Sequence, residues 1–161
     1  MGKLRVLVSL TTDDNDYQQL QAADAEQTAQ ALGVELKNAF AKNDAVEQST
    51  QLLRAMQSSP ELRPNAIILK PVGTSMLQVA RSAVSAGIGW AALNREVEYI
   101  QNLRTNSVPA FVVTSDHEEI GRIQGRQIAA LLPRSGVVLH IEGPSGDISR
   151  KRTKGMLNQT R

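Results

Sequence analysis

The sequence predicts an α/β protein in which a parallel sheet carries helices on both faces. Short aliphatic runs alternate with longer helical stretches along all 161 residues, as expected for repeated βαβ units. Hydrophobic residues make up 41% of the chain and aromatic residues only 3%, which predicts an aliphatic core. The length suits about one ordinary domain with a core of its own.

The first half of the chain supplies two strand–helix pairs. A strand is predicted over 4–10, and the Asp and Asn side chains of TTDDND can cap a helix over 16–32 that ends at Gly33. A second strand over 34–40 alternates apolar and polar residues, and a helix follows over 44–57. Each helix is expected to bury an apolar stripe. The two stripes are Tyr17, Leu20, Ala23, Ala31 and Leu32, and then Val46, Leu53 and Met56.

The second half continues the same alternation. The run AIILK is continuously apolar, as expected for a central strand covered on both faces, and Pro71 ends it. Ser75 can cap the next helix, and the polar connection over 95–107 has room for a helical turn. The predicted strands are 66–70, 90–94, 110–115 and 136–142, and the predicted helices are 75–86, 118–132 and one from about 149 onward.

Composition and motifs argue against several classes of protein. The net charge is only +2, so nucleic acid is not an expected partner. The basic residues of 150–154 fall in the wrong register for a phosphate-binding loop. The absence of cysteine excludes disulfides and thiol chemistry. The two histidines form no metal-binding motif, and His140 is expected to pack in the core within its strand.

The chain shows no catalytic machinery. Ser115, Asp116 and His117 are adjacent in sequence, which does not build a triad, and no G-x-S-x-G motif is present. A phosphorylated receiver domain would need an Asp at the end of the third strand, where this chain has Lys70. We therefore expect no enzyme, no cofactor and no metal.

Polar residues gather where the predicted strands end. Ligands of open α/β sheets bind at the carboxyl ends of the strands, and a few convergent polar groups beside one aromatic ring suit a small polar ligand. Helix capping is the alternative role for several of them, above all for Asp44 and Ser75. These residues are Asn15, Asp16, Tyr17, Asn43 or Asp44, Lys70, Asn94, Arg95, Ser115, Asp116 and the segment 143–152.

A resemblance to a known family joins these segments in order. They are VSLTTDDNDYQQ, GVEL with NDAVEQSTQLL, AIILKPVGTSML, AGIGWAALNREV, VVTSDHEEIGRIQGRQIA and LHIEGPSGDISRKRTKGM. In this order the chain resembles the type I periplasmic sugar-binding proteins, the ribose- and galactose-binding group. The resemblance implies a Rossmann-like or flavodoxin-like lobe and a solute-binding component of an ABC transporter.

The resemblance also implies roles for particular residues. Asn15 and Tyr17 would be a hydrogen-bonding group and a ring platform on the first loop, and Asn94 with Arg95 takes the place of the family's common Asp-Arg pair. Ser115 and Asp116 fall where the chain crosses between two lobes. Arg152 matches an arginine that reaches the ligand from the second lobe. The first loop departs from the family pattern, since Asp16-Tyr17-Gln18 stands where members often have Pro and two aromatics.

Length is the largest departure from the family, whose members have two complete lobes. The resemblance implies an N-terminal ligand-binding lobe over 1–114 and, over 115–161, the hinge crossing and the start of an incomplete second lobe. A lobe without its usual neighbours exposes apolar surface. We therefore expect self-association, or a poorly ordered C-terminal segment.

The expected function is binding of a small polar ligand, with sugars as the leading class, and its delivery to an ABC transporter permease by hinge closure. The start of the chain lacks the pattern of a signal peptide, so a periplasmic location implies that such a peptide has been removed. The alternatives are a ligand-sensing domain of a transcriptional regulator or membrane sensor, and a small flavodoxin-like enzyme.

Overall fold

The computed structural model describes residues 2–73, 76–104, 108–132, 134–143 and 146–160. The chain divides into two compact units, Met1–Thr114 and Ser115–Arg161, which are described separately. The strands are β1 (Arg5–Leu10), β2 (Glu35–Phe40), β3 (Ala66–Leu69), β4 (Gly89–Leu93) and β5 (Ala110–Val113). The helices are α1 (Asp16–Leu32), α2 (Ala45–Met56), α3 (Leu77–Ser85), α4 (Ile100–Leu103), α5 (His117–Leu131) and α6 (Asp147–Leu157).

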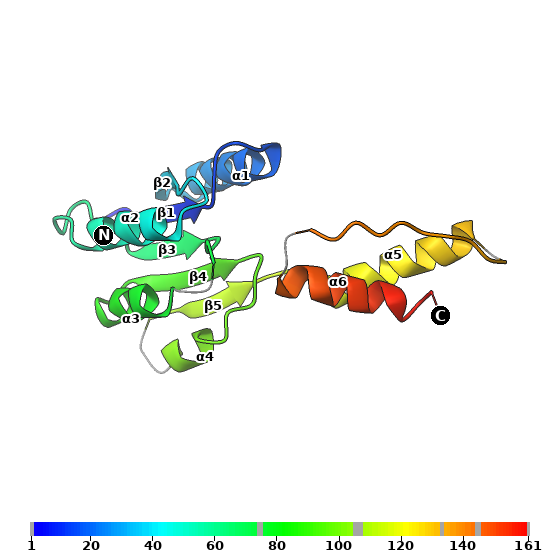
Figure 1. The fold of residues 1–161 in the computed structure, drawn as a ribbon. Coiled ribbons are helices and arrows are strands. Elements are labelled where there is room, and N and C mark those ends of the chain that lie inside the picture. The colour runs from blue at the N-terminus through cyan, green and yellow to red at the C-terminus, as the bar shows by residue number, and fades with distance from the viewer. Residues whose placement is uncertain (1, 74–75, 105–107, 133, 144–145, 161) are drawn as a thin grey trace. The chain divides into compact units, whose positions relative to one another are not determined.

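The first unit is a five-stranded parallel sheet in the order β2-β1-β3-β4-β5 (Figure 1). Leu7 in the centre of β1 lies opposite Lys37 of β2 and Ile67 of β3. This strand order is that of flavodoxin-like doubly wound folds, in which the direction of winding reverses between β1 and β3. The predicted fold class is confirmed.

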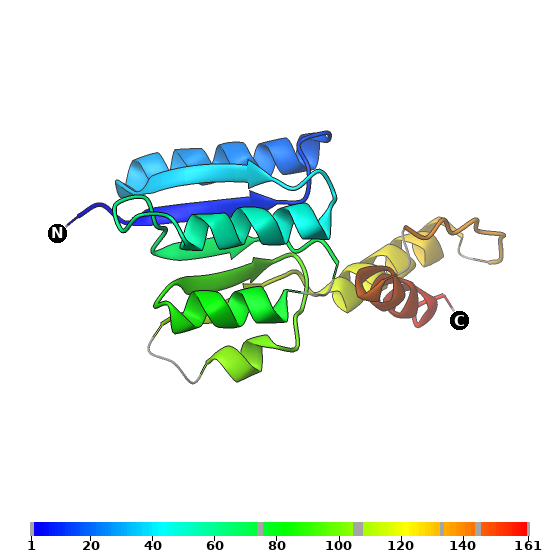
Figure 2. The ribbon, with the colours of Figure 1, turned by 60° about the vertical axis from the view of Figure 1, so that its left-hand side comes forward.

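Helices cover both faces of this sheet (Figure 2), and each face has its own apolar cluster. On one face α2, α3 and α4 pack over Leu7, Ile67 and Trp90. On the other face α1 packs over Val8 and Leu10. Alternate residues of a strand point to opposite faces, which is why neighbours in β1 belong to different clusters.

Both predicted helix stripes are wrong in most of their members. In α1 the buried residues are Gln18, Ala22 and Ala29, whereas Tyr17, Leu20 and Leu32 are exposed. The two alanines are small, so the helix backbone can approach the sheet closely.

The inward face of α2 is likewise shifted from the predicted one. Its buried residues are Gln48, Leu52 and Met56, at a spacing of four that keeps them on one side of the helix. Val46 is 75% exposed and Leu53 38% exposed, and only Met56 of the predicted stripe is buried. The prediction considered apolar residues alone, whereas the buried face includes Gln48, which is fully buried.

Polar caps set the starts of three helices. Asn15, Asp44 and Asp116 each accept a hydrogen bond from a backbone N–H in the first turn of α1, α2 and α5. Gly33 ends α1 in the left-handed conformation, with φ at 67°, which glycine adopts without strain. The predicted cap at Ser75 lies outside the described residues.

The second unit contains α5 and α6, which lie side by side (Figures 1 and 2). Glycines bring the two helices together: a Cβ atom at Gly121 would overlap the carbonyl group of Arg152, and one at Gly155 would overlap the carbonyl group of Glu118. The Nζ atom of Lys154 lies 3.2 Å from a carboxylate oxygen of Glu118, which joins the two helices by an ion pair. Close backbone contact thus joins the two helices, which run in the same direction (Figure 1).

The predicted sixth strand, 136–142, is wrong. This segment is extended but pairs with no strand among the described residues, and all of its residues are exposed. A strand needs a neighbour for its backbone N–H and C=O groups, and the described part of this unit supplies none. The expectation that His140 packs in a core is therefore also wrong, since His140 is exposed.

We expect Gly121→Ala to loosen the packing of α5 against α6. The added methyl group would meet the backbone of Arg152, and overpacking of this kind costs about 1–3 kcal/mol. Alanine has the higher helix propensity, by about 1 kcal/mol, so a loss of protection would come from the contact and not from the helix itself. Amide hydrogen exchange of α5 and α6 measures the effect.

The control for this variant is Gln127→Ala, at an exposed position of the same helix. It should leave exchange unchanged. Equal protection of α5 and α6 in the Gly121→Ala variant and the unaltered chain would contradict the role given to the glycine contact.

Candidate functional site

Two loops of the first unit leave the sheet where its winding reverses. The segment after β1 leads into α1 on one face, and the segment after β3 leads toward α3 on the other. The strands are parallel, so both segments begin at the same edge of the sheet, together with the segment after β4. In open α/β sheets this carboxyl edge, at the point of reversal, is where ligands bind.

Tyr17 and Asn94 meet at this edge although 77 residues separate them. The side-chain amide of Asn94 donates a hydrogen bond of 2.7 Å to the hydroxyl of Tyr17. Asn94 directly follows β4 and has a left-handed backbone, with φ at 62°, a conformation that Asn tolerates better than most residues. Tyr17 remains 55% exposed, so its ring is available to another molecule.

Two cations belong to the same edge. They are Lys70, which lies beside the Tyr17 ring, and Arg95, which follows Asn94. The Nζ atom of Lys70 lies 5.0 Å from the centre of the Tyr17 ring, within the range of a cation–π contact. The guanidinium of Arg95 donates a hydrogen bond of 2.6 Å to the carbonyl oxygen of Gly73. Burial lowers the pKa of Lys70 below its usual value, and the positive charge of Arg95 lowers it further. We call Tyr17, Lys70, Asn94 and Arg95 the edge cluster.

A buried amide fixes the segment that carries Lys70. The Nε2 atom of Gln48 donates hydrogen bonds of 3.0 Å to the hydroxyl of Ser9 and 3.0 Å to the carbonyl oxygen of Lys70. Its Oε1 atom accepts a hydrogen bond of 2.8 Å from the N–H of Val72. One side chain thus joins β1, the end of β3 and the loop that follows.

A second buried amide holds the segment after β1. Gln18 is 1% exposed, and its Oε1 atom accepts a hydrogen bond of 3.2 Å from the N–H of Thr11. Asn15, predicted as a ligand-binding residue, caps α1 through its Oδ1 atom and donates from its Nδ2 atom to Asp14. Its described hydrogen bonds are therefore structural.

The sequence analysis overlooked both buried glutamines and assigned Lys70 no role in ligand binding. A signal for Gln48 was present, because it lies four and eight residues before Leu52 and Met56 on one side of the helix. Nothing in the sequence distinguished Gln18 from its exposed neighbours. Lys70 was recognised as a residue at a strand end, but its approach to Tyr17 depends on the folded loops.

The remaining predicted residues belong to the second unit. Ser115 precedes α5, and Asp116 caps it by accepting a hydrogen bond of 2.9 Å from the N–H of Glu119. Arg152 lies in α6 and is partly buried, and its Nε atom has no hydrogen-bond partner among the described residues. The structure thus brings Tyr17, Asn94 and Arg95 to one edge within the first unit.

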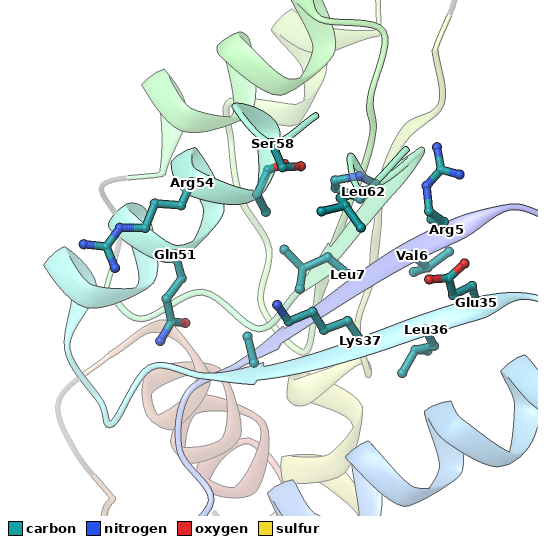
Figure 3. Close-up of a pocket in the computed structure, with 13 residues that line it drawn as sticks. Arg5, Val6, Leu7, Glu35, Leu36, Lys37, Gln51, Arg54, Ser58 and Leu62 are labelled. Carbon is teal, nitrogen blue, oxygen red and sulfur yellow. The ribbon is translucent and has the colours of Figure 1, made fainter. Parts of the chain in front are cut away.

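A separate hollow of about 510 Å³ lies between β1, β2 and α2 of the first unit (Figure 3). Its lining includes the first residues of two strands, Arg5 and Glu35, and Arg54 of α2. Arg5 is engaged with the carbonyl oxygens of Pro60 and Arg63. None of the predicted site residues lines this hollow, so we assign the candidate site to the carboxyl edge, where the polar groups converge.

The described residues contain no group of three or more His, Asp or Glu side chains that could hold a metal ion. Among the same residues, no helix combines the length and hydrophobicity that a membrane crossing requires.

Fold and site together define an open α/β domain with a polar cluster at its point of winding reversal. The sequence assigns this domain to a family, because residues 6–159 match the periplasmic binding protein domain. The chain therefore belongs to that family, as the resemblance predicted. The family is one of solute-binding proteins. A comparison with curated proteins finds no match.

Solved structures of two ABC transporter solute-binding proteins and of a myo-inositol binding protein share the fold. One from Mycobacterium smegmatis with bound glycerol has a TM-score of 0.81 and 25% identity over 98% of this chain and 52% of its own. One from Actinobacillus succinogenes with bound D-allose has a TM-score of 0.84 and 20% identity over 98% of this chain and 55% of its own. The Caulobacter myo-inositol binding protein has a TM-score of 0.78 and 20% identity over 97% of this chain and 50% of its own. The chain spans about half the length of these proteins.

We expect Gln48→Leu to destabilise the first unit by about 1–3 kcal/mol, because the N–H of Val72 and the carbonyl oxygen of Lys70 would lose their buried partner. Urea denaturation followed by the fluorescence of Trp90 measures the loss. Gln30→Leu makes the same change at an exposed position of α1 and should have little effect. Unfolding of both variants at the same urea concentration would contradict the structural role of Gln48.

Proposed function

We propose that this chain is the ligand-binding part of a solute-binding protein and takes a small polar ligand, with sugars as the leading class, at the edge cluster. The observation that carries the proposal is the convergence of Tyr17, Asn94 and Arg95 at the carboxyl edge of the sheet. An exposed ring offers a flat face to the C–H surface of a sugar. The amide and guanidinium groups offer hydrogen bonds to its hydroxyls.

The solved structures of similar fold support the ligand class. They hold glycerol, D-allose and myo-inositol, which are small molecules rich in hydroxyl groups. Asn15, Ser115, Asp116 and Arg152 belong to the proposed site as well, since they were predicted from the family resemblance. In this proposal Arg152 approaches the ligand when the two units close on it.

Closure would stabilise a ligand-bound state that an ABC transporter permease recognises. The proposed location is the periplasm, and the proposed role is non-enzymatic. The support for both is membership of the periplasmic binding protein family.

Thermal shift against a panel of monosaccharides and polyols tests the proposal. At least one member of the panel should raise the midpoint of unfolding, because a ligand that binds only the folded chain stabilises it. Tyr17→Ala should lower the affinity for that ligand by roughly tenfold, since the ring platform is lost. Tyr17→Phe should keep most of the affinity because the ring remains.

Leu20→Ala is the matched control, because Leu20 is exposed on the same helix. It should bind as the unaltered chain does. A chain that no panel member stabilises, or a Tyr17→Ala variant with unchanged affinity, would contradict the proposed function.

We also propose that the chain self-associates through the extended segment 136–142. Val137, Leu139 and Ile141 are exposed, and alternating apolar residues with an unpaired backbone favour strand pairing between copies. Sedimentation velocity should show a concentration-dependent dimer that Leu139→Lys weakens. Leu131→Lys, at an exposed position of α5, should leave it intact. A monomer at all concentrations would contradict this proposal.

A further inference from the structure

The edge cluster contains two cations and no acidic side chain. Lys70 and Arg95 form no ion pair with a carboxylate among the described residues. Asn94, which bonds to the Tyr17 hydroxyl, is neutral. The charge of the cluster is therefore positive and uncompensated within it.

Hydrogen-bond donors also outnumber acceptors in the cluster, where the only acceptors are the side-chain oxygens of Asn94 and Tyr17. A lysine ammonium has three donors and a guanidinium five, and neither accepts a hydrogen bond. One donor of Arg95 is used by the carbonyl oxygen of Gly73, and one of Asn94 by Tyr17. The hydroxyls of a neutral sugar can accept from these donors, but they leave the two positive charges uncompensated. Carboxylate and phosphate oxygens only accept, and they form the stronger, charge-assisted hydrogen bonds.

Acidic residues do lie on the loop after β1, but their described contacts are elsewhere. The carboxylate of Asp14 accepts a hydrogen bond of 3.1 Å from Asn15. Asp16 occupies the first turn of α1, where the helix N-terminus favours a negative charge. Asp13, Asp14 and Asp16 are all exposed and form no ion pair with the two cations among the described residues.

From this arrangement we infer that the ligand of the edge cluster is a small polyhydroxylated molecule that carries an anionic group, held between Lys70 and Arg95. The inference rests on the proposed function, because it specifies the ligand of the same site. The repulsion between the two cations, which contributes to the lowered pKa of Lys70, is relieved when an anion lies between them. The Tyr17 ring then contacts the C–H face of the same ligand.

A matched series of ligands tests the inference on the 161-residue chain. D-glucose, D-glucuronate and D-glucose 6-phosphate differ only at the sixth carbon, and titration followed by amide chemical shifts detects weak binding. We expect at least one of the two anionic members to bind about tenfold more tightly than D-glucose. The order of the two distinguishes a carboxylate from a phosphate ligand.

Lys70→Met should lower the affinity for the preferred anion by about tenfold, because it removes the ammonium charge. The methionine keeps an unbranched apolar side chain of similar length. Lys37→Met is the control, since Lys37 is exposed and lines the separate hollow; it should bind as the unaltered chain does. The amide spectrum of each variant shows whether it is folded.

Three results would overturn the inference. D-glucose binding as tightly as both D-glucuronate and D-glucose 6-phosphate would exclude the ligand class but leave the proposed function intact. Acetate or inorganic phosphate binding as tightly as its sugar counterpart would show that the hydroxyls contribute nothing. No binding by any member of the series, together with no stabilisation by the sugar panel, would remove both the inference and the proposed function.

Discussion

The buried amide of Gln48 is the interaction on which the candidate site most depends. It connects the hydroxyl of Ser9 in β1 with the backbone on both sides of Pro71, at Lys70 and Val72. Burial of an amide without hydrogen-bond partners destabilises the fold. These three bonds offset that cost, which is why a glutamine can pack against the sheet. The same bonds hold Lys70 at the place where the winding of the sheet reverses.

Because the strands are parallel, the segment that Gln48 holds lies beside segments that follow other strands. Residues after β1, β3 and β4 are far apart in sequence, yet their strands end at one edge. Tyr17 meets Asn94 there, and Lys70 lies over the Tyr17 ring. The edge cluster is thus a product of topology, and the buried glutamines, Gln18 and Gln48, fix two of the loops that form it.

The sequence predicted the parts of the fold that depend on local patterns. Aliphatic runs marked the five strands of the sheet, and the caps at Asn15, Gly33 and Asp44 marked helix ends, because these signals act over a few residues. The inward faces of α1 and α2 were not predicted, since tertiary hydrogen bonds decide that Gln18 and Gln48 are buried. The segment 136–142 has the pattern of a strand, but the described residues offer it no partner.

The candidate site was predictable as a region but not as an arrangement. The rule that ligands bind at the carboxyl edge placed Tyr17, Asn94 and Arg95 in one set. The contact of Lys70 with the Tyr17 ring and the bond from Arg95 to Gly73 depend on loop geometry that spacing does not encode. These contacts hold the two cations in the cluster, whose positive charge and excess of donors indicate the expected ligand.

A crystal structure of the chain grown with the ligand that stabilises it most would test the central claim directly. The account predicts electron density against the Tyr17 ring, within hydrogen-bond distance of Asn94 and Arg95. Ligand density confined to the separate hollow between β1, β2 and α2, with the edge cluster empty, would contradict it.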